Sequence, residues 1–243
     1  MADPAVLPSK PRRAVNAPTC RRAIAVAMPM ACAQPAWLQV SPSPAEVQAY
    51  AGLHRAAHQG DLPLIASASR GALDSRDSNR RTPLHVAAFA RRRDAGAALL
   101  AAGADADALD ADRYDAVTIA AVADDEPTLA ALLAGGASAK LVTSRYDGTA
   151  LIAAAHLGHA GVVRQLIAAG APLDHLNNLH WTAVIEAVVL GDGGPRHQAT
   201  LRALLDAGAD HRLADREGRS PLQLARSRGY AAMVRMLEQA GAK

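Results

Sequence analysis

Apolar residues recur along this chain in a pattern that returns about every 33 residues. Each copy contains a short alanine-rich stretch, a polar turn and a second stretch with paired leucine or isoleucine residues, and this order predicts two short helices joined by a turn. A single helix pair cannot bury its own apolar face, so the pattern predicts a stack in which each pair packs on its neighbours. One equivalent apolar position marks each copy, at spacings of 31, 33, 34, 33 and 38 residues: Leu53, Leu84, Val117, Leu151, Val184 and Leu222.

The ends of the predicted helices carry recognisable signals. Thr82-Pro83 and Ser220-Pro221 place a capping hydroxyl before a proline, which suits the first turn of a helix. A glycine follows each second helix from the second copy onward, and we expect these glycines to end it in the left-handed conformation: Gly103, Gly136, Gly170, Gly208 and Gly241.

These elements point to a known family. Thr-Pro-Leu-His at residues 82–85 and Leu-Leu-Ala-Ala-Gly-Ala at residues 99–104 resemble the two signature elements of the ankyrin repeat. The resemblance covers about residues 45–243 and implies a mainly α fold, an ankyrin-repeat solenoid of about six helix-turn-helix units with β-hairpin fingers. It also implies a non-enzymatic, monomeric module without a cofactor that binds another protein through its concave, finger-bearing surface. After a linker at 34–44, the expected repeats are about 45–76, 77–109, 110–142, 143–176, 177–214 and 215–243.

Two copies depart from the family pattern. In the third copy Asp115-Ala116 replaces Thr-Pro and Asp124-Asp125 replaces a Gly-His turn, so we expect this repeat to be the least stable. In the fifth copy a loop from Gly191 to Pro195 is inserted between the two helices. This loop lacks the frame of a phosphate-binding loop and no strand precedes it, so we expect a flexible connection.

Composition and charge narrow the class of protein. The chain has 59 alanines and only seven aromatic residues, which favours closely spaced helices over a β-sandwich or barrel. The net charge of +3 divides into +4 for residues 1–33 and −1 for the remainder. The repeats therefore have no basic excess with which to bind nucleic acid. No run of 18 apolar residues occurs, so no membrane-spanning helix is predicted.

The N-terminal segment has the order of a secretory signal peptide. Residues 1–33 end with an arginine pair, a short apolar run, a proline and an Ala-Cys-Ala motif. We therefore expect cleavage between Ala33 and Gln34 and export to a bacterial periplasm. Since Cys20 and Cys32 precede the cut, the mature chain would lack cysteine. The alternative is a disordered basic tail on a cytoplasmic regulator.

Other candidate sites are weak. His54 and His58 are four residues apart on a predicted helix, a spacing that can hold a metal, but no third ligand is evident. Catalytic motifs such as GxSxG and HExxH are absent. The alternative class is an enzyme or metal-binding protein that uses the loop at residues 191–195 and the nearby His197.

Aromatic and arginine residues mark the expected partner surface. Tyr114, Tyr146 and Trp181 are predicted at the tips of three successive fingers, with Phe89 near the end of an inner helix on the concave side. Exposed rings beside arginines are typical of binding hot spots. A structural alternative is that the rings stack on one another and stiffen the fingers. The predicted partner-binding residues are Arg81, Phe89, Asp112, Tyr114, Arg145, Tyr146, Asn178, Trp181, Arg216 and Arg219.

Overall fold

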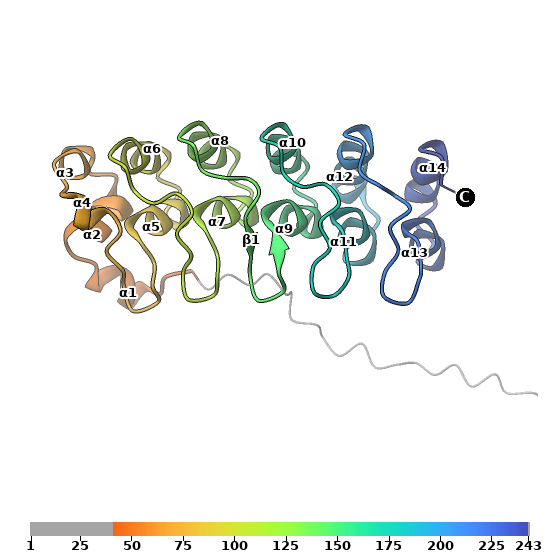
Figure 1. The fold of residues 1–243 in the computed structure, drawn as a ribbon, viewed down its shortest axis with the longest axis horizontal. Coiled ribbons are helices and arrows are strands. Elements are labelled where there is room, and N and C mark those ends of the chain that lie inside the picture. Colours follow the sequence, from red (N-terminus) through yellow and green to blue (C-terminus); the bar gives the residue numbers. More distant parts are fainter. Residues whose placement is uncertain (1–40, 243) are drawn as a thin grey trace, which may run out of the picture. The chain divides into compact units, whose positions relative to one another are not determined.

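Short helices come in pairs along the part of the chain that the structure, a computed structural model, describes: residues 41–242. The first helix of each pair lies in an inner row and the second lies in an outer row (Figure 1). The inner row contains α2 (Gly52–Gln59), α5 (Pro83–Phe89), α7 (Ala116–Val122), α9 (Ala150–Leu157), α11 (Ala183–Val189) and α13 (Pro221–Ser227). The outer row contains α3 (Leu62–Ala66), α6 (Arg93–Ala101), α8 (Glu126–Ala134), α10 (Ala160–Ala168), α12 (Pro195–Asp206) and α14 (Ala231–Gln239).

Each helix packs on the helix at the same place in the next pair. The mainly α solenoid of six helix pairs that the sequence predicts is therefore confirmed. None of the helices within residues 41–242 has the length and apolar character that crossing a membrane requires. The predicted signal sequence, its cleavage site and both cysteines fall outside the described residues.

The inner helices α7, α9, α11 and α13 begin at side chains that accept a hydrogen bond from the backbone three residues later. Thr149, Thr182 and Ser220 do this through their hydroxyl oxygens. In the third repeat the carboxylate of Asp115 takes the same place and accepts the N–H of Thr118 at 2.9 Å. The predicted departure from Thr-Pro therefore keeps a helix cap, but with a buried acid as the capping group.

The burial of Asp115 has an electrostatic consequence. Its side chain is only 1% exposed, and loss of hydration raises the pKa of its carboxyl group to about 6, although hydrogen bonds from Thr118 act in the opposite direction. The charged form of this cap is therefore penalised in the folded protein.

Small side chains fill the inner row and larger ones the outer row. Ala87, Ala120 and Ala154 of the inner helices are fully buried, as are Leu99 and Leu132 of the outer helices. Alanine allows neighbouring inner helices to approach closely, and leucine fills the space between the two rows. As predicted, the outer helices are followed by left-handed glycines, with φ between 79° and 97° at Gly103, Gly136, Gly170, Gly208 and Gly241.

Five fingers project beyond the inner row (Figure 1), at residues 77–81, 110–114, 144–148, 177–181 and 215–219. Within the described chain, paired strands occur in one of them, where β1 (Val142–Thr143) runs antiparallel to β2 (Gly148–Thr149). Val142 pairs with Thr149 and Thr143 with Gly148. The other fingers are turns without strand pairing.

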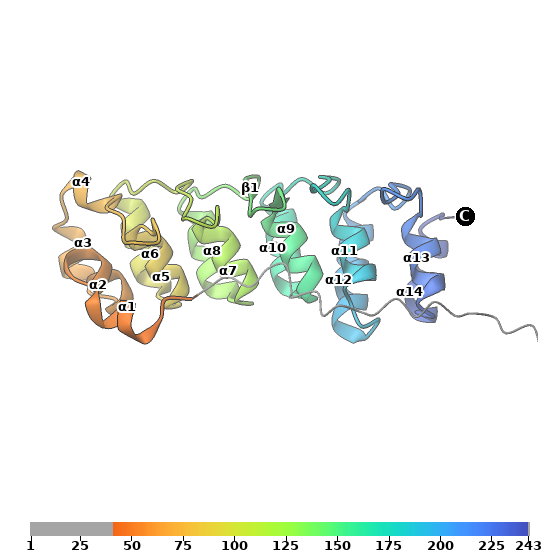
Figure 2. The ribbon, with the colours of Figure 1, turned by 90° about the horizontal axis from the view of Figure 1, so that it is seen from below.

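Two repeats differ from the others. In the first, α3 has only five residues and is followed by the short helix α4 (Arg70–Leu73), and a further helix, α1 (Pro44–Ala49), precedes the repeat. In the fifth, α12 has twelve residues where α6, α8, α10 and α14 have nine. The predicted insertion thus remains a loop up to Gly194, and α12, which begins at Pro195, has an extra turn that Figure 2 shows extending beyond its neighbours.

Candidate functional site

Four of the five fingers contain an Asp or Asn five residues before the helix cap. In each of these fingers one side-chain oxygen of that residue accepts two backbone N–H groups of the same finger, at 2.8–3.1 Å. The four residues are Asp77, Asp110, Asn177 and Asp215. In the remaining finger, the Ser144 hydroxyl oxygen accepts the N–H of Tyr146 at 3.2 Å. Our sequence reasoning missed these residues, although their constant distance from the cap was a visible signal. They give every finger a defined shape before any partner binds.

Backbone hydrogen bonds join successive fingers. The N–H of Ala111 donates to the carbonyl of Asn79, that of Ser144 to Arg113, and that of Asn178 to Tyr146, each at 2.9 Å. The first four fingers are therefore connected in one row.

Four predicted partner-binding residues also link neighbouring fingers. Arg145 pairs with Asp112 at 3.1 Å, and the Asn178 side-chain amide donates to the Arg145 carbonyl at 3.0 Å. Arg216 donates to the Asn178 carbonyl at 2.8 Å. Exposed contacts of this kind each contribute about 1 kcal/mol or less, so they orient these side chains without removing them from the surface.

The prediction that Tyr114 is exposed at a fingertip is wrong. Tyr114 is only 5% exposed and belongs to the hydrophobic core, and burial raises the pKa of its hydroxyl to about 12. It directly precedes the capping residue Asp115, where the chain turns into the inner helix. Its ring therefore occupies space in the alanine-rich interior rather than the tip.

The three predicted rings do not occupy equivalent positions. Trp181 directly precedes its cap Thr182, as Tyr114 precedes Asp115, and it is half-buried against the core. Tyr146 lies three residues before its cap Thr149, at the tip itself, and is also half-buried. The described residues therefore do not form the expected row of three exposed rings.

Arg81 also departs from the expected exposure. It is 3% exposed, and its guanidinium carbon lies 5.2 Å from the centre of the Phe89 ring, a cation–π distance. Phe89 is the last residue of α5, as predicted. Arg219, by contrast, remains exposed and pairs with Asp215 at 2.7 Å and Glu217 at 3.1 Å.

Histidine side chains connect neighbouring repeats. The Thr82 backbone N–H donates to Nδ1 of His85 at 3.1 Å, so Nε2 carries the proton and donates to the Tyr114 carbonyl at 3.0 Å. Burial lowers the pKa of His85 to about 4, which keeps this neutral form. His54 contacts the Arg81 carbonyl in the same way at 2.9 Å. Within residues 41–242 no group of three His, Cys, Asp or Glu side chains is arranged to hold a metal ion.

A buried acid in the fifth repeat escaped the sequence analysis. Glu186 of α11 is 1% exposed and accepts hydrogen bonds from Nδ1 of His156 at 3.1 Å and from the amide of Asn177 at 3.0 Å. Burial raises the pKa of its carboxyl group. This network joins α9, α11 and a finger, so it fixes the fourth repeat against the fifth.

Hydrogen bonds connect the loop at residues 191–195, for which the sequence predicts a flexible connection, to its surroundings. Asp192 accepts the N–H of Gly194 at 2.8 Å and contacts Nδ1 of His197 at 3.0 Å, and the Tyr230 hydroxyl donates to the Gly191 carbonyl at 2.9 Å. His197 also contacts the carbonyl of His156 at 3.0 Å. His197 is thus engaged in holding the loop against the neighbouring repeat.

Comparison with known proteins gives one consistent result. A family profile described as "Ankyrin repeats (3 copies)" matches residues 117–215, and one described as "Ankyrin repeat" matches residues 79–111. A putative ankyrin repeat protein from Escherichia coli K12, YahD, is 39% identical over 100 residues, which are 41% of this chain and 50% of YahD. The match thus spans half the length of that curated relative.

Solved structures extend the similarity over most of the chain. An ankyrin repeat domain from Acinetobacter baumannii is 43% identical, with a TM-score of 0.73, and the match covers 79% of this chain and 98% of that domain. The ankyrin repeat domain of Bcl-3, a member of the IkappaB protein family, is 29% identical, with a TM-score of 0.71 and coverage of 80% and 88%.

Proposed function

Because this chain belongs to the ankyrin repeat family, we propose that it is a non-enzymatic module that binds another protein through its finger-side surface. This surface consists of the five fingers and the adjacent ends of the inner helices. The family fold is in general a protein-interaction scaffold, which supports the proposal. As part of the same proposal, residues 1–33 direct the protein to a bacterial periplasm.

The observation that carries this proposal is the distribution of apolar side chains in the fifth repeat. Leu179 at a fingertip is 38% exposed, and the half-buried Trp181 lies at the base of the same finger. Tyr146 is at the tip of the preceding finger. Apolar and aromatic side chains held on a rigid frame have the composition of a binding hot spot. The binding centre is therefore assigned to the fourth and fifth repeats.

Affinity capture with the full chain tests this assignment. The chain is immobilised and the proteins retained from an extract of the source cells are quantified by mass spectrometry. Leu179→Ala and Trp181→Ala should each release the same set of retained proteins, because truncation of a hot-spot side chain costs about 2 kcal/mol of binding or more.

Leu64→Ala is the matched control. Leu64 is 42% exposed, but it lies on the outer helix of the first repeat, away from the fifth repeat. It should retain the same proteins as the unaltered chain. Retention that survives both Leu179→Ala and Trp181→Ala, or that is lost with Leu64→Ala, would refute the assignment.

A further inference from the structure

The helix α1 lies on the finger side of the first two repeats. Figures 1 and 2 show it beside α2 and α5, on the side of the inner row from which the fingers project. None of its residues is buried, and Val47 packs partly against the core, whereas Tyr50, which follows the helix, is buried. The segment before Tyr50 therefore buries little apolar surface and has a low local free energy of opening.

The carboxylate of Glu46 links α1 to the first finger. Its Oε1 accepts a hydrogen bond from the side-chain amide of Asn79, and the guanidinium of Arg81 lies 3.4 Å from the same oxygen. Its Oε2 accepts the N–H of Ser43 at 2.7 Å, which closes the capping box of α1 itself. One carboxylate oxygen of Glu46 thus caps α1, and the other accepts the hydrogen bond from the first finger.

The finger groups that receive Glu46 belong to the proposed binding surface. Asn79 is at the tip of the first finger and Arg81 at its base, where the guanidinium also faces the Phe89 ring. Asp77 is close by, but its Oδ1 accepts backbone N–H groups of the finger and its Oδ2 accepts the Tyr50 hydroxyl at 3.4 Å. Glu46 is therefore the carboxylate that approaches this pair from outside the finger.

We propose that Asn79 and Arg81 form a carboxylate-binding subsite of the finger-side surface, which Glu46 fills in the free protein and an acidic side chain of the partner fills in the complex. The proposal rests on the proposed function and names the chemistry of the partner. Arg81 is 3% exposed and its guanidinium lies 3.4 Å from the Glu46 carboxylate, so a partner that displaces Glu46 restores this interaction only with a carboxylate of its own. Loss of a charged hydrogen-bond partner in such a place is costly, which selects an aspartate or glutamate in the partner segment.

A peptide copied from the segment that contains Glu46 can be used to test whether the subsite binds a carboxylate. A fluorescently labelled synthetic peptide with the sequence of residues 41–51 is titrated with the full chain, and binding is followed by fluorescence anisotropy. The Glu46→Gln chain should bind this peptide about ten-fold more tightly than the unaltered chain, because the unaltered chain fills the subsite with its own carboxylate. The same peptide with Glu46→Gln should bind the Glu46→Gln chain about ten-fold more weakly.

Two further chains complete the test. Asn79→Ala, introduced into the Glu46→Gln chain, should abolish the gain in binding, whereas Trp181→Ala in the same background should leave it unchanged. Since the probe does not use the fifth repeat, failure here is distinct from failure of the capture experiment. Equal binding of the peptide to the unaltered and Glu46→Gln chains, or equal binding of the Glu and Gln peptides, would overturn the subsite. Circular dichroism confirms that each chain is folded.

Discussion

Replacement of Asp115 by Asn should change how the stability of this protein depends on pH. Asn keeps a side-chain oxygen that can accept the Thr118 N–H, but it carries no charge at any pH. The substitution therefore separates the capping hydrogen bond from the cost of burying a carboxylate. Asp115 suits this test because it is 1% exposed and because burial raises the pKa of its carboxyl group to about 6.

The direction of the effect follows from proton linkage. An aspartate has a pKa of about 3.9 in the unfolded chain, so between about pH 4 and pH 6 the folded protein binds more protons than the unfolded chain. The stability that the protonated form of Asp115 supplies is present below about pH 4 and is lost as the pH rises through 6. A difference of about two pKa units corresponds to about 3 kcal/mol as an upper limit.

Urea unfolding of both proteins between pH 4 and pH 8 measures this difference. Asp115→Asn should gain up to about 3 kcal/mol relative to the unaltered protein between pH 4 and pH 7. His85 also titrates in this range, but it is common to both proteins and cancels in the difference. Asp61→Asn, at an exposed cap, should show a difference that varies by less than about 0.5 kcal/mol. A stability difference for Asp115→Asn that is flat across this range would refute the reasoning.

Three further predictions concern separate parts of the chain. Gly193→Ala should cost at least about 1 kcal/mol more than Gly229→Ala in urea unfolding, since both glycines have φ near 72° but only at Gly193 would a Cβ lie 2.5 Å from the Tyr230 ring. His180→Gly should raise the free energy of unfolding by about 0.5 kcal/mol because His180 has φ of 66°, whereas His180→Ala should not. N-terminal sequencing of protein from its native cells should give Gln34 as the first residue; an uncleaved N-terminus would contradict export.

The helix framework was predictable because it depends on signals that are local in the sequence. A hydroxyl before proline begins α5 and α13, and a glycine follows each outer helix from α6 onward, so Thr82 and Gly103 could be placed without knowledge of the neighbouring repeats. The repeated period then implied the stack. Asp115 was noticed as a departure, but its capping role and burial required the structure.

The exposure of individual side chains was less predictable, because it changes when a residue lies one or two positions closer to the helix cap. Tyr114 directly precedes its cap and is buried, whereas Tyr146 lies three residues before its cap, at a fingertip, and is half-buried. The alanine-rich core also leaves space that a ring can fill, which a count of aromatic residues does not reveal. Glu186 was missed because its partners His156 and Asn177 come from 30 and 9 residues away.

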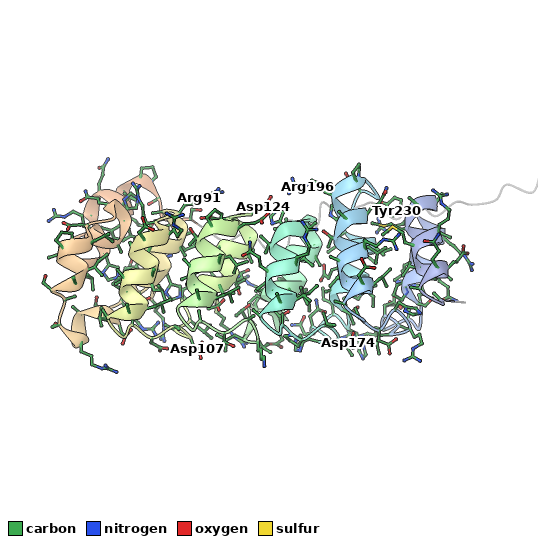
Figure 3. The ribbon with its side chains drawn as sticks, turned by 90° about the horizontal axis from the view of Figure 1, so that it is seen from above. Arg91, Asp107, Asp124, Asp174, Arg196 and Tyr230 are labelled. Carbon is green, nitrogen blue, oxygen red and sulfur yellow. The ribbon has the colours of Figure 1, made fainter. Side chains whose placement is uncertain are left out.

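The extra turn of α12 gives the stack a connection that skips a repeat. Arg196, on that turn, pairs with Asp124 of the third repeat at 3.0 Å across the fourth repeat, and Figure 3 shows both along the edge opposite Asp107 and Asp174. In a repeat protein, bending is normally set only by contacts between adjacent units. This ion pair opposes an increase in the distance between the third and fifth repeats along the edge of the stack on which it lies. It therefore restricts the bending of repeats three to five. Because both side chains are exposed, salt weakens this ion pair. The curvature of the finger-side surface should therefore change with ionic strength, even when the partner is uncharged.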